Sequence, residues 1–285
     1  MNHPTKILAG GAALCIALSS CGRKESGTTI KVNGSDTMLQ VGLKWQEGYK
    51  NAKPDTIISM NGEGSGVGIK QLINGEIDLA HSSRQIKESE ATKIKEKFSK
   101  DPVETVFGYD RIAVYVHKDN PIDSITLEQL KGIFAEGGTI KDWSAIDPSK
   151  SGAVERCSRS NTSGTYSFFR DAVCGKGTEF KKGATTMTGS AAVVDFVKTT
   201  PNSIGYSGMG YKTDDVKWLK VAPATGEAVD PTSDAYPISR KLYGYTVGKP
   251  EGAAKEYIDW CKSDPGQEIL QGEKFVPLLP EERTK

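Results

Sequence analysis

Residues 159–165 have a composition suited to holding a small anion. The segment reads Arg159-Ser-Asn-Thr-Ser163-Gly164-Thr165 and runs directly into a helical pattern that begins at Tyr166. Backbone N–H groups at a helix start lack partners within the helix and lie at the positive end of its dipole. The guanidinium of Arg159 adds a planar fork of donors that matches a tetrahedral oxyanion. This segment alone is compatible with an anion site and also with an ordinary capped helix beside a surface arginine.

Two further segments have the same character. Residues 33–38 and residues 62–68 each follow a short strand-like run, contain Gly and Ser, and precede a helical pattern. Ligands gather at such strand ends in α/β sheets. Nucleotide motifs are absent, because no turn ends in Gly-Lys-Ser/Thr and Val67 and Ile69 stand where a dinucleotide motif needs glycine. The three turns therefore predict donors that converge on something small and negative, with no cofactor or metal.

The elements that position these turns alternate between strand and helix. Extended runs are expected at 30–32, 56–60, 79–80, 110–117, 204–207 and 241–247, and helices at 39–51, 68–74, 88–98, 126–134, 166–172, 190–199, 253–262 and 266–271. This alternation predicts an α/β fold with mostly parallel sheets. With 285 residues, of which 36% are hydrophobic, the chain can bury one or two cores. The formal net charge of +1 argues against a nucleic-acid-binding surface or a polybasic membrane patch.

The N-terminus is predicted to be an export signal. Lys6 precedes an apolar run at 7–18, which is too short to span a bilayer stably and ends in Leu18-Ser-Ser-Cys21. This ending resembles a bacterial lipobox, so we expect a signal peptide at 1–20, lipidation at Cys21 and a tether at 21–27; the alternative is an ordinary cleaved signal with an incidental cysteine. The expected location is the cell envelope, where the protein is lipid-anchored to the membrane and faces the periplasm or the exterior.

Three cysteines remain beyond the lipidation site: Cys157, Cys174 and Cys261. An odd number permits at most one internal disulfide. Cys157 and Cys174 bracket the helix after the anion loop, and they are either a staple for that helix or free thiols. The cysteines have no short paired spacing and no nearby histidine, which argues against a metal site.

A series of motifs in a fixed order makes the chain resemble a known family. The motifs are Gly34-Ser-Asp-Thr-Met38, Gly64-Ser-Gly66, Asp78-Leu-Ala-His-Ser-Ser-Arg84, Ile112-Ala-Val114, Asn120-Pro121, Leu127-Glu-Gln-Leu130, Asp142-Trp143, the loop 159–165 and Pro237-Ile-Ser-Arg240. In this order they resemble the phosphate-binding lipoproteins of Pst-type ABC transporters, which belong to the periplasmic-binding-protein class.

This resemblance implies an architecture and a function. The implied fold is α/β and two-lobed, of the type II periplasmic-binding-protein kind, with two crossover hinge strands. Lobe one would comprise residues 28–110 and 236–285, and lobe two residues 111–235. The implied function is that of a monomeric binding protein, not an enzyme, which captures inorganic phosphate in the interlobe cleft and delivers it to the permease subunits of an ABC importer.

The resemblance also implies a set of binding residues. Arg159 matches the arginine that bonds the oxyanion and is the one cation expected there. The full phosphate-binding set is Ser35, Thr37, Met38, Ser65, Ser83, Asp110, Arg159, Ser163, Gly164 and Thr165. In the best-known branch an aspartate that accepts the phosphate proton lies in the segment occupied here by residues 82–84. Because Ser83 cannot take that part, Asp110 is the preferred acceptor and Asp36 the second choice, with Arg84 either steadying the carboxylate or lying on the surface.

Two alternatives remain open from sequence. One keeps the binding fold and changes the anion to sulfate, molybdate or tungstate. The other is an exported phosphate-ester hydrolase, for which His81 and His117 are the only histidines in the mature chain. His117 ends a strand-like run and reads as a surface residue, and no Gly-x-Ser-x-Gly turn accompanies His81.

Overall fold

The computed structural model describes Met1 and residues 27–283. The expected signal peptide, the lipidation site Cys21 and the tether up to residue 26 lie outside the described residues, apart from Met1. Within the described part of the chain, no helix has both the length and the apolar character needed to cross a membrane.

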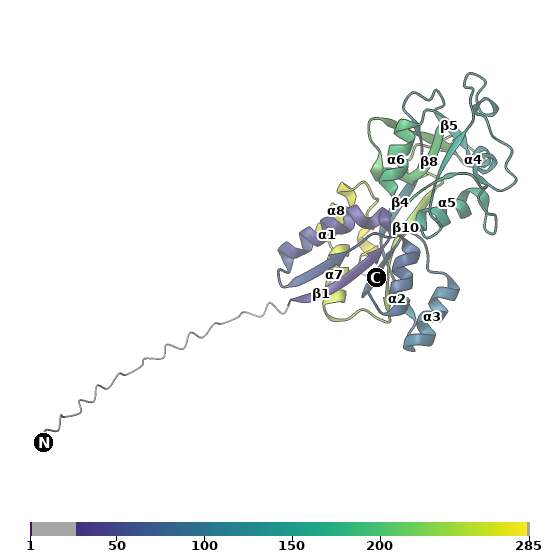
Figure 1. The fold of residues 1–285 in the computed structure, drawn as a ribbon. Helices are drawn as coiled ribbons and strands as arrows, with labels where there is room; N and C mark the ends of the chain where they lie inside the picture. Colours follow the sequence, from purple (N-terminus) through teal and green to yellow (C-terminus); the bar gives the residue numbers. More distant parts are fainter. Residues whose placement is uncertain (2–26, 284–285) are drawn as a thin grey trace.

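The first of two lobes, called here the β1 lobe, is built around three parallel strands (Figure 1). Its strands are β1 (Thr28–Gly34), β2 (Thr56–Met60) and β3 (Leu79–Ser82). Its helices are α1 (Leu39–Ala52), α2 (Ser65–Asn74), α3 (Glu88–Phe98), α7 (Gly252–Lys262) and α8 (Asp264–Gly272), and a 3-10 turn, η1 (Asp36–Met38), links β1 to α1. Large buried aromatic residues, among them Trp45, Phe107 and Tyr257, fill its core.

The second lobe, called here the β8 lobe, has its own core. Its strands are β5 (Ser124–Thr126), β6 (Glu155–Arg159), β7 (Thr185–Met187), β8 (Ser203–Gly208) and β9 (Val216–Ala222). Its helices are α4 (Leu127–Phe134), α5 (Gly164–Cys174) and α6 (Ser190–Thr199), with 3-10 turns η2 (Trp143–Ala145) and η3 (Met209–Tyr211). The rings of Phe169 and Tyr206 stack at 3.9 Å at the centre of this core.

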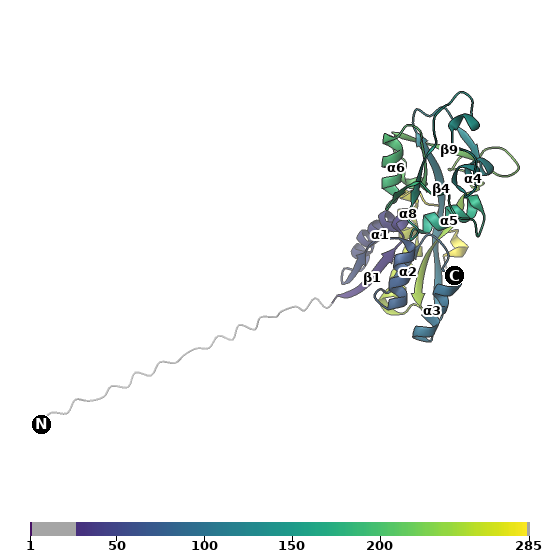
Figure 2. The same cartoon turned by 45° about the vertical axis from the view of Figure 1, so that its right-hand side comes forward.

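Two long strands, β4 (Pro102–His117) and β10 (Ser239–Val247), connect the lobes (Figures 1 and 2). Residues 102–111 of β4 pair antiparallel with β10, whereas residues 112–117 pair with β8 and β9. The chain crosses back in the first residues of β10, since Ile238, just before this strand, packs in the core of the β8 lobe and Leu242 in that of the β1 lobe. The predicted two-lobed fold with crossover strands is therefore confirmed.

The structure corrects several details of the sequence analysis. The crossover strands pair antiparallel with their neighbours, so the sheet is mixed and not mostly parallel. Strand β4 begins at Pro102, earlier than the expected 110, and α2 begins at Ser65, earlier than the expected 68. Cys157 and Cys174 are free, buried thiols, and the disulfide that sequence left open is not formed.

Candidate functional site

The three donor-rich turns meet where the two lobes touch. The Thr37 hydroxyl in η1 lies 2.9 Å from the Thr165 hydroxyl in α5. A second contact joins the same lobes, because the N–H of Gly66 donates to the carbonyl of Thr162 at 2.9 Å. The side chains of Thr37 and Thr165 are buried. The structure thus brings residues more than a hundred positions apart into one polar cluster.

Glycine at two positions permits this close approach. A Cβ atom on Gly164 would lie 2.3 Å from the Ser65 hydroxyl and 2.5 Å from the Ser83 hydroxyl. Gly34 has φ of 139°, and a Cβ there would lie 2.0 Å from the carbonyl oxygen of His81. Side chains rarely tolerate such contacts, so these glycines let backbone and hydroxyl groups converge.

Three serines complete the donor set: Ser65 and Ser163 lie at helix starts, and Ser83 follows strand β3. Ser65 begins α2, and its hydroxyl accepts a hydrogen bond from the N–H of Ser83 at 3.0 Å. The two hydroxyls of Ser65 and Ser83 lie 3.3 Å apart. Ser163 caps α5 by accepting from the N–H of Tyr166 at 3.3 Å. The ends of α2 and α5 therefore face each other across the lobe boundary, which suits an anion.

Arg240, which the sequence analysis did not assign to the site, lies at the centre of the cluster. Its Nε and Nη2 donate to Oδ2 of Asp110 at 3.0 and 2.7 Å. Nη2 also donates to the hydroxyls of Thr37 at 3.2 Å and Thr165 at 2.9 Å. Nη1 donates to the carbonyl of Ser83 at 2.9 Å. One guanidinium thus touches both lobes and four of the predicted binding residues.

Arg159 forms a second ion pair near the same cluster. Its Nη2 donates to Oδ2 of Asp36 at 3.1 Å and to the carbonyl of Thr188 at 3.0 Å. Its Nη1 donates to the hydroxyl of Ser190 at 2.8 Å. Its Nε is buried and has no hydrogen-bond partner among the described residues, so this group retains a donor for a ligand.

Asp110 is fully buried. Burial raises the pKa of the Asp110 carboxyl, and the charge and hydrogen bonds of Arg240 act in the opposite direction. Burial also lowers the pKa of the Arg240 guanidinium, which the Asp110 charge opposes. Oδ1 of Asp110 has no partner within the described residues. A buried carboxylate with a free acceptor atom is suited to receive a hydrogen bond from a protonated ligand.

Three other residues considered in the sequence analysis have surroundings of their own. Arg84 donates to both carboxylate oxygens of Glu90, at 2.7 and 2.9 Å, so the idea that it steadies Asp110 is wrong. The Met38 side chain packs in the core of the β1 lobe, and its N–H donates to the carbonyl of Ser35 at 3.1 Å. The Ser35 hydroxyl is buried without a partner in the part of the chain described.

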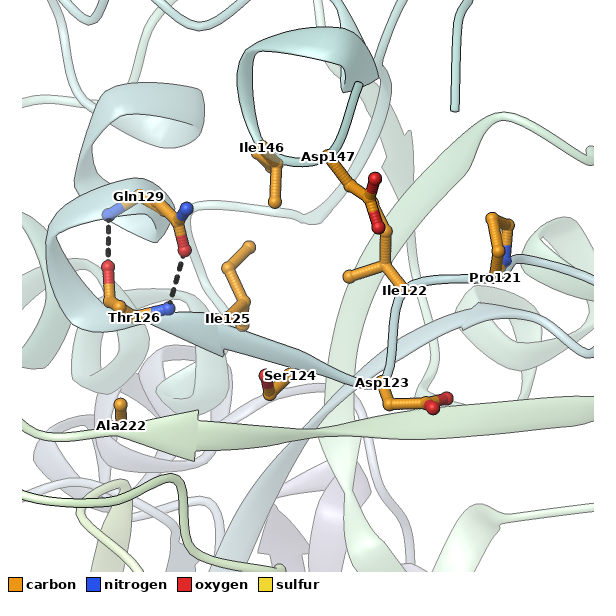
Figure 3. A pocket seen from close by; sticks show the side chains of 10 residues that line it. All are labelled: Pro121, Ile122, Asp123, Ser124, Ile125, Thr126, Gln129, Ile146, Asp147 and Ala222. Carbon is orange, nitrogen blue, oxygen red and sulfur yellow. Dashed lines mark hydrogen bonds between the residues drawn. The ribbon is translucent and has the colours of Figure 1, made fainter. Parts of the chain in front are cut away.

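A separate cavity of about 430 Å³ lies in the β8 lobe, around β5 and the start of α4 (Figure 3). Pro121, Asp123, Asp147 and Ala222 are among its lining residues, and none of the residues that line it belongs to the predicted binding set. The predicted site and this cavity are therefore distinct features of the molecule.

Comparison with known proteins agrees with the two-lobed fold. Residues 21–265 match the profile of the PBP superfamily domain. The phosphate-binding protein PstS of Pseudomonas aeruginosa is 30% identical over 277 residues, which cover 90% of this chain and 85% of that protein. PstS of Staphylococcus saprophyticus is 31% identical over 293 residues, which cover 97% and 89%.

A solved structure agrees with these relatives. It is a putative phosphate ABC transporter substrate-binding protein from Clostridium perfringens with bound phosphate, 27% identical, with a TM-score of 0.78 over 88% of this chain and all of that one. The chain belongs to the PBP superfamily and, within it, to the family of PstS-type phosphate-binding proteins. This family consists of extracytoplasmic substrate-binding proteins.

Proposed function

We propose that this protein captures inorganic phosphate between its two lobes and delivers it to the permease subunits of an ABC importer. The observation that carries the proposal is the convergence of α2, α5 and η1 on the hydroxyls of Thr37 and Thr165, with Arg240 bonded to both. The names of the relatives support it, as does the phosphate in the C. perfringens protein.

In this proposal phosphate is held by donors from both lobes. The hydroxyls of Thr37, Ser65 and Thr165 and the two arginines bond its oxygens, together with the remaining predicted residues Ser35, Met38, Ser83, Ser163 and Gly164. Helix starts and oriented hydroxyls stabilise the charge without a mobile counterion.

Asp110 is proposed as the group that distinguishes phosphate from sulfate. Phosphate near neutral pH carries a proton that it can donate to a carboxylate, whereas sulfate carries none. A sulfate beside Asp110 would set two negative groups together without a shared hydrogen. Sites built around one hydrogen bond reject analogues that lack it by as much as roughly 10⁴–10⁵-fold.

The sequence analysis expected lobes of residues 28–110 with 236–285, and of residues 111–235. Because Tyr236 and Ile238 pack in the core of the β8 lobe and Leu242 in that of the β1 lobe, we place the return crossing at the start of β10. Closure would bend the molecule at this crossing and at β4. Small-angle scattering should show that saturating phosphate compacts the monomeric protein, with one phosphate bound per chain. An unchanged radius would remove the hinge model.

Binding of labelled phosphate to residues 22–285, with sulfate as competitor, tests the function directly. We expect strong preference for phosphate in the wild type, with weaker binding and a narrower preference in Asp110→Asn, because an amide can donate to either anion. Equal competition by sulfate in the wild type would favour another oxyanion. Turnover of a generic phosphate ester would indicate the hydrolase instead of a binding protein without catalytic activity.

We also propose that Cys21 carries a lipid that anchors the protein to the membrane of the cell envelope. The support is the lipobox-like sequence Leu18-Ser-Ser-Cys21 after a short apolar run. Cys21→Ser should abolish lipid labelling and release the protein from the membrane fraction. Continued membrane association of this variant would mean that another feature holds the protein there.

A further inference from the structure

Asp36, in the β1 lobe, is bound by three groups that all come from the β8 lobe. Its Oδ2 accepts a hydrogen bond from the N–H of Ser190 at 2.7 Å and from Nη2 of Arg159 at 3.1 Å. Its backbone carbonyl accepts from the hydroxyl of Tyr211 at 3.1 Å. Burial, and then the charge of Asp36, raise the pKa of the Tyr211 hydroxyl, which therefore remains a donor. All these contacts join protein groups to each other.

The contact with Ser190 supplies a cap that helix α6 lacks. The residue at its N-cap position is Gly189, which offers no side chain, and the N–H of the first helical residue is instead satisfied by Asp36. A Cβ on Gly189 would lie 3.2 Å from Oδ1 of Asp36, so glycine leaves room for the carboxylate. An anionic group at a helix start is stabilised by the exposed N–H groups and the helix dipole. Here the capping group belongs to the other lobe.

The contact with Arg159 orients the guanidinium. Asp36, Ser190 and the carbonyl of Thr188 hold its two terminal nitrogens. Two of these partners lie in the β8 lobe, and Asp36 completes the set only when the lobes touch. The direction in which Arg159 presents its remaining donor thus depends on a residue from the opposite lobe.

We propose that Asp36 is an interlobe latch: it holds the lobes together by capping α6 from across the boundary, and it positions Arg159 as they close. The proposal extends the proposed phosphate-binding function and depends on it, because a rate of phosphate release can be measured only if the protein binds phosphate. The latch acts on closure and not on the identity of the anion. Because the Asp36 side chain keeps 19% of its surface exposed, water screens the pair and its effect is moderate.

The test compares Asp36→Asn and Tyr211→Phe with the wild type and with Asp55→Asn, which removes the same charge from an exposed position of the same lobe. Stopped-flow release of labelled phosphate should be about tenfold faster in Asp36→Asn, which corresponds to about 1.4 kcal/mol. Tyr211→Phe should accelerate release about threefold, and Asp55→Asn should match the wild type. Scattering without any anion should show a larger radius for Asp36→Asn than for the wild type.

Specific outcomes would overturn the latch. A release rate in Asp36→Asn equal to that of Asp55→Asn would do so. A changed preference between phosphate and sulfate would also do so, because it would indicate that the Asp36 carboxylate contacts the anion. If Asp36→Asn does not fold, an unchanged release rate in Tyr211→Phe overturns it. If the wild type binds no phosphate, the proposed function fails, while the radii of the anion-free proteins still decide whether Asp36 holds the lobes together.

Discussion

Two arginine–aspartate pairs lie close together near the lobe boundary and belong to different parts of the architecture. Arg240 and Asp110 are direct partners in the antiparallel ladder of the crossover strands β10 and β4. Arg159 and Asp36 are 123 residues apart and belong to opposite lobes. The first pair is fixed by backbone hydrogen bonds, and the second depends on how the lobes sit against each other.

The two pairs also differ in how far their aspartates are exposed to water. The Asp110 side chain is 0% exposed, whereas that of Asp36 is 19% exposed. Removing one partner of a fully buried pair leaves a charge without solvent, but a partly exposed partner can turn to water. The Arg240–Asp110 pair should therefore matter most for folding, and the Arg159–Asp36 pair most for binding.

The largest expected effect is on folding, from Arg240→Ala. This change leaves Asp110 buried without its cation, and the free energy of unfolding should fall by about 3–5 kcal/mol. Denaturant unfolding measures it, with Lys241→Ala, at the exposed neighbouring position of β10, as the control. A loss no larger than that of the control would show that Asp110 is not charged in the folded protein.

Arg159→Ala should affect binding more than folding. The anion would lose a charge-assisted partner, and by analogy with truncated charge pairs the loss of binding free energy is about 2–5 kcal/mol. Calorimetry should show phosphate affinity reduced by about two orders of magnitude or more. Arg156→Ala, on the same strand and bonded to the carbonyls of Lys181 and Lys182, is the control. Wild-type affinity in Arg159→Ala would remove this residue from the site.

The contrast between the two pairs also explains which site residues sequence could reveal. Local patterns predicted the donor turns, because a strand, a Gly/Ser turn and a helix start are adjacent in the chain. The position of Arg240 opposite Asp110 depends on the pairing of β4 with β10, 130 residues apart. No local pattern carries that pairing, and Arg84 was considered instead as a residue that could steady the acceptor carboxylate. The Pro237-Ile-Ser-Arg240 motif was the signal that could have pointed to Arg240.

The secondary structure also divides into elements that local sequence patterns predict and elements that depend on long-range strand pairing. Helix α6 occupies the predicted 190–199, since its apolar residues Val193, Val194 and Val197 recur at helical spacing. The first half of β4, from Pro102, was missed; its residues before Phe107 are half-buried or exposed, and none is fully buried. The structure makes it a strand through pairing with β10. Tertiary pairing decided what local propensity left open.

A third buried polar group, His81, lacks the ionic partner that both arginines have. Burial holds the pKa of His81 at about 3, against an ordinary value of 6.5. The unfolded chain therefore binds a proton below about pH 6.5 that the folded protein takes up only near pH 3. The contribution of neutral His81 to the free energy of unfolding is complete above about pH 6.5, and it declines as the pH falls from there toward about 3. Between about pH 7.5 and pH 5 the loss should be about 2 kcal/mol.

His81→Phe tests this effect, since its ring would sit between Trp45 and Phe107, whose rings lie 6.0 and 5.6 Å from that of the histidine. Denaturant unfolding at both pH values should show a shallower pH dependence for His81→Phe than for the wild type. A wild-type slope in His81→Phe would assign the acid sensitivity to other groups.

The smallest expected effect compares a helix cap within one lobe with the cap that Asp36 provides across the boundary. Thr126 caps α4 from its own lobe: its hydroxyl accepts from the N–H of Gln129 at 3.0 Å, and the Gln129 side chain accepts from the N–H of Thr126 at 2.9 Å (Figure 3). Thr126→Ala should lower the free energy of unfolding by about 1 kcal/mol. Because this cap does not touch the other lobe, phosphate release should keep its wild-type rate, as stopped-flow measurement would show. Faster release in Thr126→Ala, by as much as in Asp36→Asn, would mean that helix stability in the β8 lobe controls closure, and the two caps would then differ in position but not in function.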